Sequence, residues 1–284
     1  MKSVIIVADD FGISLAVNEA VEAAHRHGIL STASLMVGAP VAADAVARAK
    51  RLPNLRVGLH LNLVDGRPVL PSREIPALVR GRDEFDCNLV RAGVRFFFLP
   101  RARRELAREI RAQFAAFHAT GLTLDHVNAH KHIHLHPTVA GLVVEIGRDF
   151  GIKAMRVPAE PVAPLRRAFP DERFATPLYK PWIERLRRRL RRAGLVTNDQ
   201  IFGLAWSGAM SETRILGLLP HLPEGVSEIY FHPTADGRPG ELAALLSPAV
   251  ARRLAELGVA PVTYSDLTSR ERALPLRQHR AANI

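Results

Sequence analysis

The chain has 284 residues, of which 48% are hydrophobic, a net charge of +11 and a single cysteine, Cys87. This length and apolar content allow a large packed α/β domain and argue against extensive disorder. One cysteine excludes an internal disulfide and a four-cysteine metal site, and it fits a reducing, cytoplasmic compartment.

The N-terminal run MKSVIIVA looks briefly like a signal peptide. Asp9 and Asp10 interrupt it before it reaches the length of a signal h-region, so we expect a first strand there. No run of about 18 consecutive apolar residues occurs, so no transmembrane helix is expected. We therefore expect a cytoplasmic protein and leave open a peripheral contact with the inner face of the membrane.

Apolar, β-rich runs alternate with helical patterns along the chain. The expected strands are residues 4–8, 33–37, 55–63, 122–127, 154–157, 200–205, 228–231 and 261–264. A helix capped by Ser14 and ended by Gly28 follows the first strand, and other helical patterns cover residues 41–52, 139–146, 212–219 and 240–257. Seven or eight βα units in this length predict an α/β fold, a (β/α) barrel of seven or eight parallel strands with room for distortion. Residues 1–284 are expected to form one domain, with helical, basic insertions near 71–121 and 158–198.

The stretch HVNAHKHIHLHP, from His126 to Pro137, holds five of the twelve histidines in the chain. In a helix, His126, His130 and His134 would share one face, as in helical zinc motifs. In an extended strand all five would point the same way, because all have even numbers. A solvated polar loop is the third alternative. The apolar residues before the stretch and the helical pattern after Pro137 favour a strand that runs out into a loop just before a helix.

In a βα barrel, the C-terminal ends of the strands build the active site. Two adjacent carboxylates at the end of a buried strand are costly unless a positive group neutralises them. A turn or helix-capping aspartate would be the simple explanation of ADDFG, but at least two histidines converge on the same face, which makes a divalent metal ion the better compensator. On an extended backbone the two carboxylates would point in opposite directions, so that one could bind metal while the other stays free. The polar residues at the strand ends are Asp9, Asp10, His60, Asn62, the histidine cluster, Arg156 and His232.

Several separated motifs also carry a family resemblance. VADDFGIS, VGLHLNL, HVNAHKHIHLHP, MRVP and YFHPT occur in the order and spacing of the YdjC-like carbohydrate deacetylases, which the chain resembles nearly from end to end. NEAVEAAHRHGILSTASLMVGAP, AGVRFFFLP and LDHVNAHKHIHLHPTVAG are most similar to the members associated with hopanoid biosynthesis. The resemblance implies a barrel hydrolase that removes the acetyl group of an N-acetylated sugar with one divalent metal ion. It places the metal ligands at Asp10, His60 and His130, the general base at Asp9 and an acid at His232.

The chemistry of amide hydrolysis agrees with these roles. A metal ion lowers the pKa of bound water to about 7 and polarises the amide carbonyl. Asp9 would take the water proton, and an imidazole such as His232 would give one to the leaving nitrogen. Zinc suits the imidazole ligands, whereas magnesium or manganese would suit a more hydrated site.

Four more residues are expected at the substrate or around the ligands. Arg156 could hold Asp9 or a sugar hydroxyl, and Asn62, His132 and His134 would line the sugar site or orient the ligands. The chain departs from the chitooligosaccharide members of the family, which have Asp at the position of Asn128 and a further His at the position of Lys131. The charge beside the metal and the sugar specificity are therefore not carried over.

Much of the positive charge is concentrated in one segment. Residues 165–192 hold ten Lys or Arg and three acidic residues. In YKPWIERLRRRLRRAGL, we expect Trp182, Leu186 and Leu190 on one helical face, with Ile183 beside it and six arginines around the rest. The pattern fits a core-facing helix with a solvated outer surface, or an interfacial helix on anionic lipid with FFFLP, residues 96–100, as an apolar patch nearby.

Together these features predict a metal-dependent N-deacetylase of an N-acetylglucosaminyl substrate, a glycosylated hopanoid lipid. The alternatives are a deacetylase of soluble N-acetylated oligosaccharides, a metal-dependent phosphoesterase, and a non-enzymatic basic protein that binds nucleic acid or membrane. No nucleic-acid-binding motif accompanies the arginines, so nucleic acid is not an expected partner. An oligomer stays open.

Overall fold

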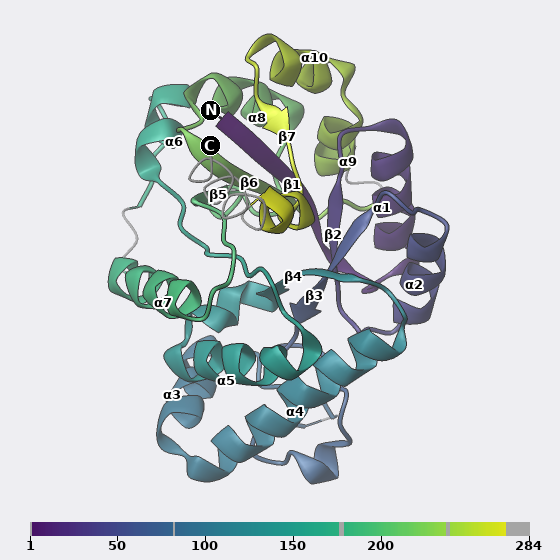
Figure 1. Cartoon of the computed structure of the whole chain (residues 1–284), viewed down its shortest axis with the longest axis vertical. Coiled ribbons are helices and arrows are strands. Elements are labelled where there is room, and N and C mark those ends of the chain that lie inside the picture. Colours follow the sequence, from purple (N-terminus) through teal and green to yellow (C-terminus); the bar gives the residue numbers. More distant parts are fainter. Residues whose placement is uncertain (1, 82, 176–178, 237–238, 271–284) are drawn as a thin grey trace, which may run out of the picture.

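The computed structural model describes residues 2–81, 83–175, 179–236 and 239–270. Its strands are all paired in parallel within one sheet, in the order β4-β3-β2-β1-β6-β5, with β7 also beside β1. β1 runs through the middle of the molecule (Figure 1). The strands are β1 (Lys2–Phe11), β2 (Thr32–Leu35), β3 (Arg56–Leu61), β4 (Leu124–Ala129), β5 (Gln200–Phe202), β6 (Gly225–Phe231) and β7 (Ala260–Pro261).

The sheet curls from β4 back towards β5. Val127 in β4 forms an isolated parallel bridge with Met155, and Ala154 forms another with Val196. Beyond these, the N–H of Ile201 in β5 donates to the carbonyl of Ala159. The predicted α/β fold, a distorted barrel of parallel strands, is confirmed. Residues 154–157 were expected to form a full strand, but they contribute only these isolated bridges.

Helices surround the sheet, with α1 and α2 on the right of Figure 1, α8 and α10 at the top and α3, α4 and α5 at the bottom. Ser14 caps α1 as predicted, since its side chain accepts a hydrogen bond from the N–H of Val17. The single helix expected over 240–257 is two, because Ser247 caps a new helix that Pro248 begins. The helices are α1 (Leu15–His27), α2 (Ala42–Lys50), α3 (Leu89–Phe98), α4 (Pro100–Ala119), α5 (Pro137–Gly147), α6 (Val162–Ala168), α7 (Lys180–Arg192), α8 (Glu212–Leu218), α9 (Pro239–Leu246) and α10 (Pro248–Glu256), with 3-10 turns η1 (Ser72–Glu74), η2 (His130–Leu135), η3 (Arg148–Phe150) and η4 (Leu219–His221).

The arginine-rich helix α7 buries a slightly different face from the one expected. Ile183, Leu186 and Leu190 are its buried residues, whereas Trp182 is 45% exposed. The buried stripe therefore starts one residue later than predicted. The predicted insertions hold η1, α3 and α4 near 71–121, and α6 and α7 near 158–198. Within the described residues, no helix combines the length and apolarity needed to cross a bilayer.

Side chains of β1 alternate between two hydrophobic layers. Val4, Ile6 and Ala8 belong to the large core between the sheet and its helices. Ile5 and Val7 belong to a smaller cluster inside the curl, together with Tyr230 and Tyr264. Because strand residues alternate with period two, the next residue of the inner row is Asp9.

Candidate metal and catalytic site

β1 delivers two adjacent carboxylates to one place at the C-terminal edge of the sheet. Asp9 lies 3.8 Å from Nδ1 of His60, and Asp10 lies 3.2 Å from Nε2 of the same ring. Asp10 has a φ of 60°, and the register with β2 shifts between Ala8 and Phe11. This local turn of the backbone brings both carboxylates to the same imidazole. The prediction that they point in opposite directions is therefore wrong, because it assumed a regular strand.

Asp10, His60 and His130 form a cluster of ligand-type atoms, one from each residue, that all lie within 4.8 Å of one another. Oδ1 of Asp10 is 3.1 Å from Nδ1 of His130. β1 supplies Asp10, β3 supplies His60, and His130 begins η2 directly after β4. One carboxylate and two imidazoles are a donor set that suits zinc and leaves positions open for water and substrate. The three residues expected as ligands are thus together, in an arrangement that could hold a divalent ion.

Asn128 fixes the orientation of the His60 ring. Nδ1 of His60 donates to Oδ1 of Asn128 at 2.6 Å, and Nδ2 of Asn128 donates to Asp9 at 3.0 Å and to Ser34 at 2.9 Å. An amide oxygen can only accept, so Nδ1 of His60 carries a proton and Nε2 faces Asp10. Burial lowers the pKa of His60, but Asp9 and Asp10 raise it overall, and Nε2 of the ring faces Asp10.

Arg156 holds the carboxylate of Asp9 from the opposite side. Its Nη1 and Nη2 lie 2.5 Å and 2.9 Å from the two oxygens of Asp9, and its Nε lies 2.6 Å from Glu228. All three side chains are buried. Burial alone would raise the pKa of Asp9, but Arg156 and His60 hold it well below the usual range. Asp9 is therefore ionised, and the guanidinium of Arg156 lies between two carboxylates with no surface exposed to a sugar.

The pKa of Asp10 is also depressed. Burial raises it, but hydrogen bonds with His130 and His60 lower it far more. Asp10 is thus a permanently charged carboxylate at the pH of the cell. A charged carboxylate beside two imidazoles is the state that a metal ligand requires, since ligands must be deprotonated to bind.

The histidine cluster is not extended beyond β4. The strand ends at Ala129, and Lys131 and His132 adopt left-handed φ values of 50° and 52° within η2. The extended alternative, in which all five histidines point the same way, is therefore wrong, and so is the single helix. The favoured alternative, a strand that leaves its sheet just before a helix, is confirmed, because α5 begins at Pro137.

His132 and His134 lie beside Tyr230 and Arg156 in neutral form. Nε2 of His132 is 3.4 Å from the hydroxyl of Tyr230, and Nε2 of His134 is 3.1 Å from the carbonyl of Arg156. Burial and the positive charge of Arg156 lower the pKa of His132 well below its usual value and that of His134 to about 3. Neither ring therefore carries a positive charge near neutral pH.

His232 follows β6 on the side of the site where Tyr230 lies. Its ring is 5.5 Å from the ring of Tyr230, and its backbone N–H donates to Glu241. It is close enough to Asp9 to contribute to the low pKa of that carboxyl. The expected acid is therefore near the expected base.

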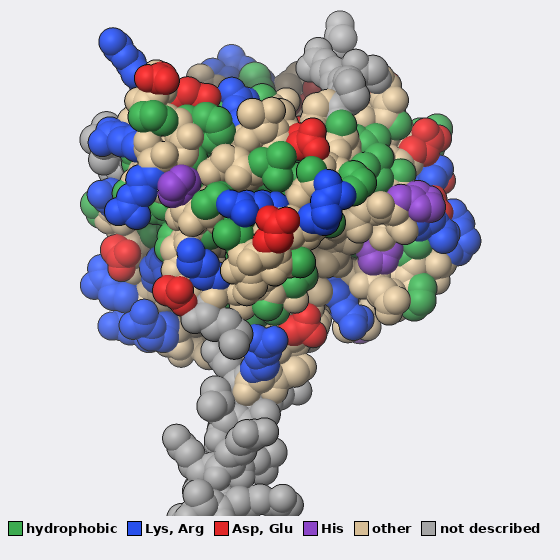
Figure 2. Space-filling view, turned by 90° about the horizontal axis from the view of Figure 1, so that it is seen from above, with side chains coloured by type: hydrophobic (Ala, Val, Ile, Leu, Met, Phe, Trp, Pro, Cys, Tyr) green, Lys and Arg blue, Asp and Glu red, His purple; other side chains and the backbone are tan. Residues whose placement is uncertain are grey.

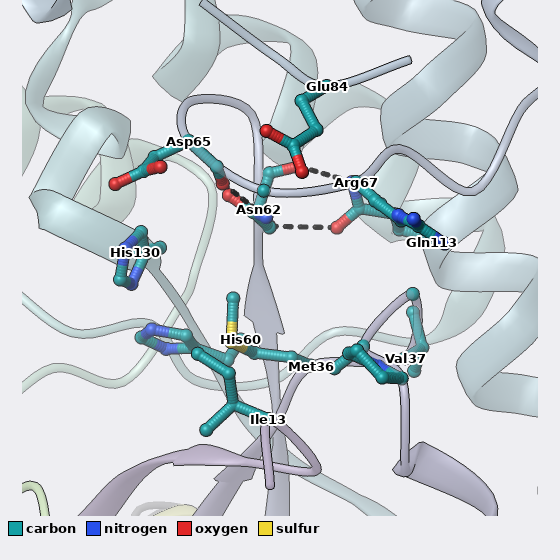
Figure 3. Close-up of a pocket in the computed structure, with 14 residues that line it drawn as sticks. Ile13, Met36, Val37, His60, Asn62, Asp65, Arg67, Glu84, Gln113 and His130 are labelled. Atoms are coloured by element: carbon teal, nitrogen blue, oxygen red, sulfur yellow. Dashed lines mark hydrogen bonds between the residues drawn. The ribbon is translucent and has the colours of Figure 1, made fainter. Parts of the chain in front are cut away.

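A cavity of about 250 Å³ opens beside the ligand cluster (Figure 3). His60 and His130 lie at one side, Ile13, Met36 and Val37 form an apolar wall, and Asn62 lies opposite. The other expected site residues do not line this cavity: Asp9, Asp10, His132, His134, Arg156 and His232. The other polar lining residues are Asp65, Arg67, Glu84 and Gln113.

Asn62 presents an unused acceptor in this wall. Its N–H donates to Gln113 at 2.9 Å and its Nδ2 donates to the carbonyl of Asp65 at 2.7 Å. Its buried Oδ1 has no hydrogen-bond partner among the residues that the structure describes. Sequence reasoning missed Gln113, since nothing in a helical pattern shows that one polar residue of α4 reaches the end of β3.

The fold and the site together define a barrel-like α/β protein with a candidate metal site at the C-terminal edge of its strands. Residues 3–256 match the YdjC-like protein family, and the chain belongs to that family. The predicted family is therefore confirmed, while the closer likeness to members associated with hopanoid biosynthesis stays a prediction.

Named relatives and solved structures agree with this placement. The chain is 30% identical over 276 residues to a carbohydrate deacetylase of Geobacillus stearothermophilus, with 92% of this chain and 96% of that protein covered. It is 38% identical over 148 residues to a carbohydrate deacetylase of Brevibacillus brevis, with 52% and 56% covered. A putative cellobiose-phosphate cleavage protein from Enterococcus faecalis shares the fold with a TM-score of 0.73 at 24% identity, over 94% of this chain and 98% of that one.

Proposed function

We propose that this protein is a metal-dependent carbohydrate deacetylase that hydrolyses the acetamide of an N-acetylglucosaminyl substrate. The observation that carries the proposal is the cluster of Asp10, His60 and His130 at the edge of a cavity, with the ionised Asp9 against the same imidazole. The full-length relative from Geobacillus, named a carbohydrate deacetylase, supports the reaction class.

The charges of the side chains suggest a role for each residue of the site. A divalent ion held by Asp10, His60 and His130 would acidify a water molecule and polarise the amide carbonyl. We assign to Asp9 the role of accepting the proton of that water, since its carboxylate lies 3.8 Å from Nδ1 of His60. Arg156 fixes both of its oxygens but also lowers its pKa, which makes Asp9 a weak base that needs an acidified water as its partner.

His232 is the proposed general acid for the leaving nitrogen. His134 is buried, His132 is half-buried, and both are uncharged near neutral pH because their pKa values are depressed. They are therefore poor sources of a proton at neutral pH, and we assign them to the support of Arg156 and Tyr230. His232 is the remaining histidine whose charge acts on Asp9.

The cavity suits a sugar that carries an acetamide. Its apolar wall of Ile13, Met36 and Val37 can pack against a methyl group or a ring face, while Oδ1 of Asn62 can accept a hydrogen bond from a hydroxyl or amide N–H. A substrate group that donates to this oxygen would give a hydrogen-bond partner to a buried polar atom, and leaving such an atom unpaired costs about 1–3 kcal/mol. We therefore assign Asn62 to substrate binding.

The finer proposal is that the sugar belongs to a glycosylated hopanoid lipid, reached by a cytoplasmic protein at the membrane surface. It is supported by the resemblance of residues 18–40, 92–100 and 124–141 to members associated with hopanoid biosynthesis. A soluble N-acetylated oligosaccharide is the alternative substrate.

The test is acetate release from N-acetylglucosaminides and N-acetylglucosaminyl lipids, before and after chelation, with product masses measured. We expect acetate and a free amine, loss of both on chelation, and recovery with a divalent ion. Release of phosphate from phosphate esters without acetate would instead identify a phosphoesterase. Metal-loaded protein that releases no acetate from any sugar would overturn the proposal.

A further inference from the structure

The two faces of α3 are both apolar. Ala92 and Phe96 are buried against the protein. On the outer side, Val90, Val94 and Phe98 are 77%, 53% and 69% exposed. These three residues are spaced by four, so they form one stripe along the helix. A helix that faced only water would be polar on this side, and a contiguous exposed apolar patch marks a surface that meets something else.

Neighbouring apolar residues widen this stripe at both ends of the helix. Leu89 precedes it, and Phe97 and Leu99 follow, each between 39% and 48% exposed. Phe97 also packs against Phe98 and against the ring of His136. The α3 patch is therefore Leu89, Val90, Val94, Phe97, Phe98 and Leu99.

Arginines surround the α3 patch. Residues 89–104 contain five arginines and no acidic residue. Arg91 and Arg95 pair with Asp86 and Arg101 pairs with Glu105, whereas Arg103 and Arg104 extend from the start of α4 as exposed side chains. A patch of apolar side chains bordered by cations is complementary to a surface with an apolar interior and an anionic boundary.

The basic helix α7 lies on the same side of the molecule. Both α3 and α7 pack against α5, and both lie on the left of Figure 1. Lys and Arg side chains outnumber acidic ones along the left edge of Figure 2, the side on which α7 lies. The groove between α5 and α7 has a volume of about 620 Å³, and its charged lining residues are Arg148, Arg185, Arg188, Arg189, Arg192 and one acidic residue, Glu145.

We propose that the α3 patch, together with the arginines of α7, docks on an anionic lipid bilayer. The apolar side chains would enter the acyl boundary and the arginines would meet the phosphates of the headgroups. A second copy of the chain fits less well, since a two-fold contact would set arginines against arginines. Nucleic acid would satisfy the arginines but leave the apolar stripe in water.

The chain segment that leads into α3 also contributes to the cavity. Glu84 lines the cavity and precedes α3 by five residues. The N–H of Phe85 donates to the carbonyl of Gly66, another lining residue, which ties this segment to the cavity. The use of the surface rests on the proposed function, because a lipid-borne sugar could reach the cavity from the bilayer. The docking itself does not require that activity.

Cys87 offers a direct probe, since it is the single cysteine, is exposed, and lies two residues before α3. The full chain is labelled there with an environment-sensitive fluorophore and titrated with vesicles of phosphatidylglycerol and phosphatidylcholine. We expect a blue shift and saturable binding that weakens with salt and with the fraction of anionic lipid. Absence of binding to anionic vesicles would overturn the proposal.

Matched variants test the residues. Val90→Gln, Val94→Gln and Phe98→Gln together keep helix propensity and should lower vesicle affinity by about tenfold or more. Leu15→Gln, on α1 at the opposite side and 52% exposed in the parent, should leave affinity unchanged. Thermal unfolding of each variant checks the fold. Affinity unchanged in the triple variant, or a parent dimer that the triple variant converts to a monomer without a change in vesicle binding, would refute the assignment.

Acetate release from a soluble N-acetylglucosaminide separates this inference from the proposed reaction. The triple variant should retain soluble turnover within about twofold, since α3 contributes no residue to the cavity. Vesicle binding without any deacetylation would overturn the proposed function and support the docking surface. Deacetylation without vesicle binding would support the proposed function and overturn the docking surface.

Discussion

Replacement of Arg156 by Met should destabilise the protein strongly and in a pH-dependent way. The guanidinium is fully buried and is shared between Asp9 and Glu228, with N–O distances of 2.5 to 2.9 Å. Met has a similar volume but no charge, so the variant leaves two buried carboxylates without their cation. Removing one partner of a buried ion pair costs about 3–5 kcal/mol. At about 2–4 °C for each kcal/mol, the midpoint of thermal unfolding should fall by roughly 10 °C.

The pH dependence has a definite sign. In the parent protein the pKa of Asp9 is depressed, so its contribution to stability is present above the unfolded pKa and is lost only in acid. Burial is the largest single influence on Asp9, and without Arg156 it is opposed mainly by His60, so we expect the pKa of Asp9 to rise above its unfolded value. The stability deficit of the variant should therefore grow as pH rises from about 4 to 8.

Thermal or urea unfolding at pH 5 and pH 8 measures both effects. Arg111→Met is the matched control, because the pair of Arg111 and Asp149 has side chains that are 54% and 58% exposed and should be worth less than about 1 kcal/mol. Adding Glu228→Gln to the Arg156 variant should recover part of the loss, since it removes one of the two unpaired carboxylates. A loss no larger than that of the control, or one that does not change with pH, would refute this account of the buried network.

Three further outcomes test the site and its surroundings. Asp9→Asn should keep metal binding but lower turnover by about 10²- to 10⁴-fold, and unchanged turnover of metal-loaded protein would contradict its role as base. His130→Ala should weaken zinc binding in competition with a chromogenic chelator, and an unchanged affinity would remove His130 from the ligand set. Substitution of the exposed α7 arginines by Gln should weaken binding to anionic vesicles by about 1 kcal/mol for each charge, with turnover of a soluble sugar nearly constant; equal loss in both assays would place them in the fold or the site. The substitutions are Arg185→Gln, Arg188→Gln, Arg191→Gln and Arg192→Gln. Arg187 and Arg189 are kept, because Arg187 donates to the carbonyl of Asp199 and Arg189 lies over Gly141.

The parts of the site that lie on regular strand ends could be predicted from the sequence. Asp10, His60 and His130 each follow an apolar β-rich run, and parallel strands bring such ends to one edge. What could not be predicted is the local backbone. The left-handed φ values of Asp10, Lys131 and His132 are set by tertiary contacts, and no Gly or Asn marks these positions. The direction in which each carboxylate and histidine side chain points could therefore not be predicted from the sequence.

The supporting residues were hidden for a different reason. Glu228, Tyr264 and Asn198 occur in ordinary strand and loop patterns, yet the hydroxyl of Tyr264 donates to Glu228 at 2.5 Å and lies 3.2 Å from Oδ1 of Asn198. A buried polar partner is defined by what lies across the barrel, and a single sequence holds no record of those distances. The same holds for α7, where Trp182 was expected on the buried face and is exposed.

Asp9 is the point at which two buried hydrogen-bonded chains meet, and this explains how a charged residue can occupy the inner row of β1. On one side, Arg156 joins it to Glu228 and the polar cluster around Tyr264. On the other, Asn128 joins it to Ser34, whose hydroxyl oxygen lies 3.1 Å from Nε2 of His126. His126 then donates through Nδ1 to Asp125. The amide of Asn128 ties the orientation of His60 to that of Asp9, because its oxygen accepts from His60 and its nitrogen donates to Asp9. The interior of the barrel therefore aligns the ligand and the base together, and a substitution deep within it would be expected to disturb both at once.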